Sequence, residues 1–158
     1  DVAPANATNK AVTFKSSNTK LATVNNKGVV TTKKAGAGKK VTITATANDG
    51  SNVVSNKLTI KIMKYGVKKV SFKKKTMNVK AGQKVTLKPT ITLTNKKAKK
   101  SQVNKTLSWK SSNEKWATVN SKGKVTTKKA GKGKTVTITA TSTDGTNKKA
   151  TVKIKIKK

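Results

Sequence analysis

Apolar and polar residues alternate along several short stretches of the chain. Residues 41–46 and 136–141 both read Val-Thr-Ile-Thr-Ala-Thr, and residues 152–157 read Val-Lys-Ile-Lys-Ile-Lys. A period of two residues places the apolar side chains on one face of a β-strand and threonine or lysine on the other face. Residues 58–62 repeat the apolar spacing of residues 152–156. These stretches predict strands whose apolar residues, Leu58 among them, point into a core.

Turn signals separate the predicted strands. Glycine ends the polar segments 26–28 and 121–123, and an Asp-Gly pair occurs at residues 49–50 and 144–145. Such residues are typical of the tight turns that join neighbouring strands. No stretch shows the 3.6-residue period of an amphipathic helix. Short strands at close spacing with glycine-containing turns predict an all-β chain built as a β-sandwich.

The chain contains an internal repeat of domain length. Residues 11–50 align without gaps on residues 106–145, with 28 of 40 positions identical. One fewer residue after the second Asp-Gly pair brings residues 58–62 into line with residues 152–156. A period this long predicts two tandem modules rather than a short-repeat solenoid.

The order of motifs in the second copy carries a family resemblance. Residues 109–113 read Trp-Lys-Ser-Ser-Asn, residues 116–119 read Trp-Ala-Thr-Val, and the strand 136–141 and the pair 144–145 follow. This order resembles the bacterial immunoglobulin-like (Ig-like) group 2 family, and the run 79–87 resembles that family's opening strands. The resemblance implies Greek-key sandwiches that serve as a surface stalk, adhesin segment or accessory module. It carries over no catalytic residue.

The two copies differ in what precedes the shared core. We expect an Ig-like first module at residues 1–64 and an Ig-like second module at residues 65–158. About 40 residues precede the shared core in the second module and only ten in the first. The first module therefore lacks its opening strands within this sequence. Three explanations stay open: the strands lie upstream, the gap stays partly open, or another chain fills it by strand addition.

The composition narrows the chemistry that the chain can perform. Among 158 residues there are 38 lysines and no arginine, against four acidic residues, which gives a net charge of +34, and there is no histidine. Cysteine is also absent. Without histidine or cysteine there is no imidazole base, no thiolate nucleophile and no ordinary zinc or copper site, and four scattered carboxylates make a paired-acid mechanism or a calcium cage unfavourable. We therefore expect no enzyme, no cofactor and no metal site.

Three aromatic residues have predicted positions in the sandwiches. Phe14 and Trp109 are equivalent, and each is expected to be buried as the large aromatic residue of its core. Trp116 replaces Leu21 of the first module and lies off the face shared by Ala117 and its neighbours. Packing at the sandwich edge is the favoured interpretation for Trp116, and a stacking platform for a sugar is the alternative.

Lysine is the main functional signal. The first module carries 11 lysines and two acids (+9), and the second carries 27 lysines and two acids (+25). A charge of this size attracts polyanions by steering and counterion release. The absence of arginine argues against bidentate reading of bases or phosphates. The densest lysine clusters form the candidate polyanion-binding site: Lys73, Lys74, Lys75, Lys96, Lys97, Lys99 and Lys100. The alternative interpretation is a solvated surface with a lysine bias.

These features favour one function over three others. The leading hypothesis is a non-catalytic structural or adhesive module of a bacterial cell-surface or secreted protein, with lysine-rich faces that contact an anionic polysaccharide or cell-wall polymer. The alternatives are a phage virion decoration or tail module, an accessory module of a secreted polysaccharide-degrading enzyme, and a non-specific nucleic-acid binder. No apolar run reaches the roughly 20 residues needed to span a bilayer.

Overall fold

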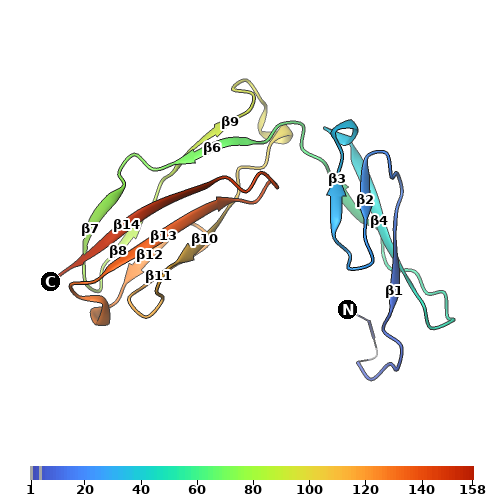
Figure 1. The fold of residues 1–158 in the computed structure, drawn as a ribbon, viewed down its shortest axis with the longest axis horizontal. Helices are drawn as coiled ribbons and strands as arrows, with labels where there is room; N and C mark the ends of the chain where they lie inside the picture. Colours follow the sequence, from blue (N-terminus) through green and yellow to red (C-terminus); the bar gives the residue numbers. More distant parts are fainter. Residues whose placement is uncertain (1, 4) are drawn as a thin grey trace. The chain divides into compact units, whose positions relative to one another are not determined.

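The computed structural model describes residues 2–3 and 5–158 (Figure 1). In this part of the chain, the stretches in which apolar and polar residues alternate form strands. This confirms the all-β fold predicted from the sequence. The chain divides into two compact units, residues 1–64 and residues 65–158, which we call the first and second modules. Between strands lie single turns of 3₁₀-helix: η1 (Lys34–Gly36), η2 (Lys100–Gln102) and η3 (Lys129–Gly131).

The second module is a closed sandwich. Its strands are β6 (Val67–Ser71), β7 (Thr76–Lys80), β8 (Lys84–Thr86), β9 (Thr90–Leu93), β10 (Leu107–Ser111), β11 (Ala117–Val119), β12 (Lys124–Thr127), β13 (Thr135–Ser142) and β14 (Lys149–Lys157). One sheet has the order β10-β13-β14-β7, another has the order β11-β12-β8, and β6 pairs with β9. The β14–β7 pairing is parallel and the other pairings are antiparallel.

The first module repeats part of this arrangement. Its strands are β1 (Val12–Ser16), β2 (Ala22–Val24), β3 (Val30–Thr32), β4 (Lys40–Ala47) and β5 (Leu58–Lys61), in sheets β1-β4-β5 and β2-β3. The register repeats as well, because Phe14 pairs with Ala45 in the first module and Trp109 pairs with Ala140 in the second. Among the described residues, no strand precedes β1.

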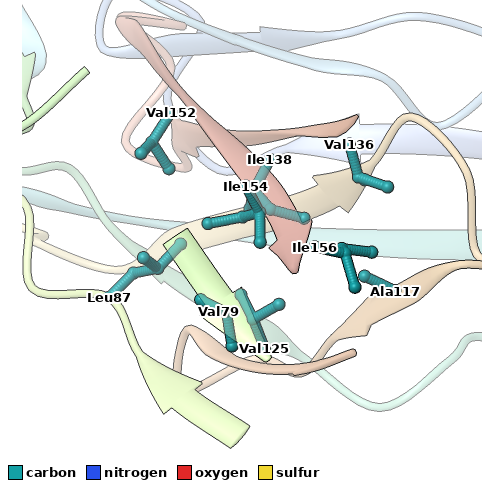
Figure 2. Packing of buried hydrophobic residues seen from close by; sticks show 9 residues of the cluster. All are labelled: Val79, Leu87, Ala117, Val125, Val136, Ile138, Val152, Ile154 and Ile156. Atoms are coloured by element: carbon teal, nitrogen blue, oxygen red, sulfur yellow. The ribbon is translucent and has the colours of Figure 1, made fainter. Parts of the chain in front are cut away.

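The core of the second module lies between its sheets. Figure 2 shows the side chains of β7, β11, β12, β13 and β14 converging on one cluster, together with Leu87 after β8. Val125, Val136, Ile138 and Ile154 are fully buried there. Burial of a side chain of this size stabilises the fold by roughly 1.5–3 kcal/mol relative to exposure. The first module has a smaller buried cluster, consisting of Ala22, Val41 and Ile62.

The repeated Ser-Ser-Asn segment is a structural corner. The buried Ser111 Oγ donates to Ala117 O at 2.7 Å, and the Asn113 N–H donates to Ser111 Oγ at 3.3 Å. The Thr137 N–H donates to Ser112 Oγ at 3.0 Å, which ties the same corner to β13. Equivalent bonds join Ser16 Oγ to Ala22 O at 2.8 Å in the first module. Since these hydroxyls satisfy backbone groups at the end of the strand, the motif serves the fold.

The aromatic residues Phe14 and Trp109 are half-buried, so the prediction that they would be buried is only partly right. Trp109 packs against both apolar clusters of the second module, and its ring centroid lies 6.2 Å from that of Phe72. A Cβ built on Gly123 would lie 2.6 Å from the Trp109 ring, and Gly123 has a φ of +73°. Glycine is therefore required both for the turn and for the space that the indole occupies.

Candidate anion-binding surface

All of the positive charge lies on the surface of the molecule. Each of the 38 lysines is exposed. Long strands achieve this by the alternation seen in the sequence: in β14, Val152, Ile154 and Ile156 are buried and the lysines between them face water. Because an exposed ammonium group keeps its hydration, this arrangement avoids the desolvation cost of a buried charge.

The structure does not bring the two predicted lysine clusters together. Lys73, Lys74 and Lys75 follow β6, whereas the cluster at residues 96–100 follows β9. β6 and β9 are antiparallel, with Ser71 opposite Thr90 at one end of the pair. The clusters therefore lie at opposite ends of this strand pair, which is about 13 Å long at the usual rise per residue. They are two separate positive regions.

The loop with the second cluster is held in shape by its own hydrogen bonds. The Lys97 N–H donates to Asn95 Oδ1 at 2.9 Å, and the Lys99 N–H donates to Gln102 Oε1 at 3.0 Å. Ala98 packs against the apolar cluster that contains the buried Val103. Since Ala98 points inward, the lysines on either side of it are presented outward from a fixed backbone.

A larger array of lysines lies on the outer face of the four-stranded sheet. In antiparallel pairs, directly opposed residues share a face, and Lys153 and Lys155 of β14 oppose Thr137 and Thr135 of β13. We call this array the β14 lysine face: Lys80, Lys110, Lys149, Lys153, Lys155 and Lys157. Alternate residues along a strand are about 6.6 Å apart, so the three lysines at 153–157 form a regular row.

The first predicted cluster adjoins this face. The Lys153 N–H donates to Lys75 O at 2.9 Å, and Lys157 lies opposite Lys80 on β7. At the end of the row, a shallow hollow of about 330 Å³ is lined in part by Lys134, Lys155 and Lys157. The Lys75 backbone thus lies beside the start of the row on β14, and the hollow lies at the other end of the row.

Sequence reasoning missed the β14 lysine face because it searched for consecutive lysines. The signal was present in the alternation of residues 152–157, which correctly predicted the wet face of a strand. The alternation does not predict which strands lie beside β14. Lys80 belongs to this face because β7 pairs in parallel with β14.

The first module has no equivalent array in its described residues. The positions of Lys153 and Lys157 are occupied by Thr59 and Met63, and only Lys61 and Lys15 match lysines of the second module's face. The first module thus has fewer lysines on this face, in line with its lower net charge, and the regular row of lysines occurs in the second module.

The acidic residue of each Asp-Gly turn stabilises the turn itself. Asp144 Oδ2 accepts from the Val67 N–H at 2.6 Å, and Asp144 Oδ1 accepts from Thr146 Oγ1 at 2.6 Å. Burial raises the pKa of the Asp144 carboxyl, but these hydrogen bonds outweigh burial, and the net pKa lies below its ordinary value. The bond to Val67 fastens β6 to the β13–β14 turn. Asp49 accepts only local bonds from Ser51, which lower its pKa.

A comparison with family models identifies the fold. Residues 1–60 and 66–154 match the model of the bacterial Ig-like domain, group 2. The chain belongs to this family. The match confirms the resemblance seen in the sequence motifs. No curated protein is similar enough to the chain to count as a relative.

Solved structures similar to this pair of Ig-like domains include domains 4 and 5 of the S-layer protein SbsC. The identity is 19%, the TM-score is 0.46, and the match covers 94% of this chain and 72% of that one. A C-terminal fragment of intimin in complex with the intimin-binding domain of the translocated intimin receptor matches at 21% identity and a TM-score of 0.36, covering 94% of this chain and 52% of that one. Mouse cadherin-23 EC22-24 matches at 15% identity and a TM-score of 0.40, covering 93% and 52%.

The Trp116 side chain of the second Ig-like domain packs against neighbouring residues of the same domain. It is half-buried against the main apolar cluster, and a Cβ built on Gly131 would lie 2.9 Å from Trp116 Cβ. Lys134 Nζ lies 5.7 Å from the centroid of the indole ring. Since the cluster covers part of the side chain and an ammonium group lies near the ring, these contacts favour the packing interpretation over a sugar platform.

Within residues 2–3 and 5–158, no group of three or more His, Cys, Asp or Glu residues could hold a metal ion. No helix in that part of the chain is long and apolar enough to cross a membrane.

Proposed function

We propose that this Ig-like pair is a non-catalytic structural and adhesive segment of a bacterial cell-surface or secreted protein, and that its second module docks on anionic polysaccharides or cell-wall polymers. Membership of the bacterial Ig-like group 2 family supports the structural part of the proposal. The β14 lysine face supports the docking part and is the observation that carries it.

The chemistry of the face suits an extended polyanion better than a small ligand. Lysine offers a compact charge without the bidentate fork of arginine, so it attracts phosphate, sulfate or carboxylate groups without demanding one geometry. The strands that form the face contain no acidic residue that would repel such groups. Threonines of β13 lie between the lysines and offer hydroxyl groups to a sugar or phosphate oxygen.

The proposed mechanism is electrostatic docking along the strand direction. A polymer with repeated anionic groups follows the row Lys153, Lys155 and Lys157, and the cluster Lys73–Lys75 extends the contact at one side. The loop with Lys96, Lys97, Lys99 and Lys100 forms a second, separate contact. Attraction of this kind releases counterions and therefore weakens as salt rises.

Heparin binding by charge-matched variants tests the assignment. The variant K153Q/K155Q/K157Q removes the row, and K20Q/K27Q/K57Q removes the same charge from exposed positions of the first module. We expect the row variant to lose at least about tenfold in heparin affinity at 0.1 M salt and the control to lose less than about twofold. The salt dependence should also become shallower in the row variant, by about one unit of slope per lost contact.

Two results would count against the proposal. Equal losses in both variants would mean that net charge alone binds heparin and that the face has no special role. Tighter binding to duplex DNA than to heparin or teichoic acid, with the same dependence on the row, would favour the nucleic-acid alternative.

The variant K96Q/K97Q/K99Q/K100Q measures the contribution of the second contact.

A further inference from the structure

The second module has another outward face, on the sheet β11-β12-β8. Val125 of β12 and Ile138 of β13 belong to one buried cluster between this sheet and the four-stranded sheet (Figure 2). Because side chains alternate between the two sides of a strand, the remaining residues of β8, β11 and β12 point away from the core. This face and the β14 lysine face therefore lie on opposite outer sides of one sandwich.

Two lysines and two threonines share the face. Thr126 of β12 lies directly opposite Thr118 of β11 on one side and Lys84 of β8 on the other. Lys124 lies two residues before Thr126 and therefore points to the same side of the sheet. The Cα atoms of Lys84 and Lys124 are diagonal neighbours on paired strands, about 7–8 Å apart. Their flexible side chains can therefore reach the same anionic group.

These side chains surround a shallow hollow, which we call the β12 hollow. Its volume is about 400 Å³. This volume is enough for a sugar or polyol unit that carries one phosphate or sulfate group. The hollow is lined by Lys84, Thr118, Val119, Asn120, Lys124 and Thr126.

The polar groups of the β12 hollow are available to a ligand. Asn120 Oδ1 accepts from the N–H groups of Lys122 and Lys124, both at 3.0 Å, so the Asn120 Nδ2 group is the donor that remains for a ligand. Within the described residues, the hydroxyls of Thr118 and Thr126 make no hydrogen bond. The three strands contain no acidic residue. Donors and positive charges without a carboxylate favour an anion.

The first module contains the same polar groups without the charge. Asn25 accepts from two backbone N–H groups of its turn, at 3.0 and 2.9 Å, and the two threonines recur as Thr23 and Thr31. Val29 occupies the position of Lys124, and no described strand of this module corresponds to β8. The turn is therefore common to both modules, and the pair of lysines is specific to the second.

We propose that the β12 hollow is a second anion-binding site, which takes one phosphate or sulfate group of a polymer, and that the second module bridges two segments of anionic polymer through its opposite faces. The bridging rests on the proposed docking at the β14 lysine face. In the hollow, Lys84 and Lys124 bind the anionic oxygens, and Thr118, Thr126 and Asn120 donate to the anion or to its sugar. A segment that follows β14 lies on the other side of the core, so the hollow takes a different segment.

NMR titration of the full chain with a heparin tetrasaccharide tests the site. We expect the Asn120 side-chain amide and the backbone amides of the row to shift as two separate sites. The hollow variant K84Q/K124Q should weaken binding at Asn120 at least about tenfold and binding at the row less than about twofold. The row variant should show the reverse. Asn25 is the internal control and should need at least about tenfold more ligand. A titration with a glycerol phosphate oligomer shows whether phosphate replaces sulfate.

Light scattering with long heparin chains tests the bridging. The measurement uses K96Q/K97Q/K99Q/K100Q as the parent chain, so that the loop at residues 96–100 makes no contact. We expect the parent to cross-link heparin, and we expect the added K84Q/K124Q change to lower scattering at least about fivefold at equal amounts of bound protein. The matched control K20Q/K27Q removes the same charge from the first module and should leave the scattering unchanged.

The failure of this proposal differs from the failure of docking at the β14 lysine face. Loss of binding at the row alone, with binding at Asn120 intact, would contradict the docking and leave the site in place. Shifts at Asn120 that equal those at Asn25, or that persist in K84Q/K124Q, would overturn the site, because net charge alone would then attract the ligand. Undiminished scattering in K84Q/K124Q would overturn the bridging.

Discussion

Ile154 and Ile60 occupy the same place in two copies of one pattern, yet Ile154 is fully buried and Ile60 is half-buried. Val125 and Val30, on the facing sheet, differ in the same way. The strands that carry these residues pair in the same register in both modules. The difference arises from β7 and β8, which close the second module and have no counterpart among the described residues of the first. Burial in a sandwich thus depends on the neighbouring strands as much as on the residue itself.

The largest expected effect comes from placing the same charge at equivalent positions. Val152→Lys buries an ammonium group in the closed core and should unfold the second module, with a loss of more than about 4 kcal/mol in the free energy of unfolding. Leu58→Lys places the same group at an exposed position and should change stability by less than about 0.5 kcal/mol. Urea unfolding of the full chain, followed by NMR signals of each module, measures both. Equal losses would mean that Leu58 is buried in solution.

Replacing the aspartate of each Asp-Gly turn should give a smaller difference in stability between the modules. Asp144→Asn weakens the hydrogen bond that fastens β6 and should cost the second module about 1 kcal/mol. Asp49→Asn should leave the first module unchanged within error, because the Asp49 bonds stay within an exposed turn. Thermal unfolding of the two variants tests this difference, which would disappear if the Val67 bond were absent in solution.

The pKa of Asp144 adds a pH dependence to this comparison. The folded-state pKa lies below the ordinary value of 3.8. The ionised carboxylate therefore contributes stability that is fully present above that ordinary value and is lost as pH falls through the folded-state pKa. The second module should lose stability as pH falls below 3.8, and Asp144→Asn should make this loss smaller. A variant with the same acid profile as the parent chain would contradict the assignment.

The smallest expected difference between the modules is the effect of salt on their melting temperatures. The second module carries +25 and the first carries +9. Screening reduces repulsion between exposed charges over about 10 Å at 0.1 M salt, so the melting temperature of the second module should rise more between 0.01 and 0.3 M salt. Melting curves resolved by module test this. No rise in either module would show that lysine repulsion does not limit stability.

The sequence predicted most of the fold because the alternation and the turns are local signals. The strand that carries Val136 and Ile138 lies where the period of two placed it, and the Ig-like fold followed from the order of motifs. Leu58 was expected to be inward and is exposed, because its burial depends on a partner strand. The separation of Lys73–Lys75 from the cluster at 96–100 depends on the pairing of β6 with β9, which no local pattern encodes.

Residue-resolved hydrogen exchange of the unmodified chain tests most directly whether the second module is closed and the first is open. The comparison is between equivalent amides: Thr32 against Thr127, and Thr59 against Lys153. Closure by β7 and β8 predicts that the amides of the second module exchange at least about a hundredfold more slowly, approaching the rate set by global unfolding of that module. Equal protection of both pairs in a monomeric chain would contradict the account, since the edges of β3 and β5 would then be covered.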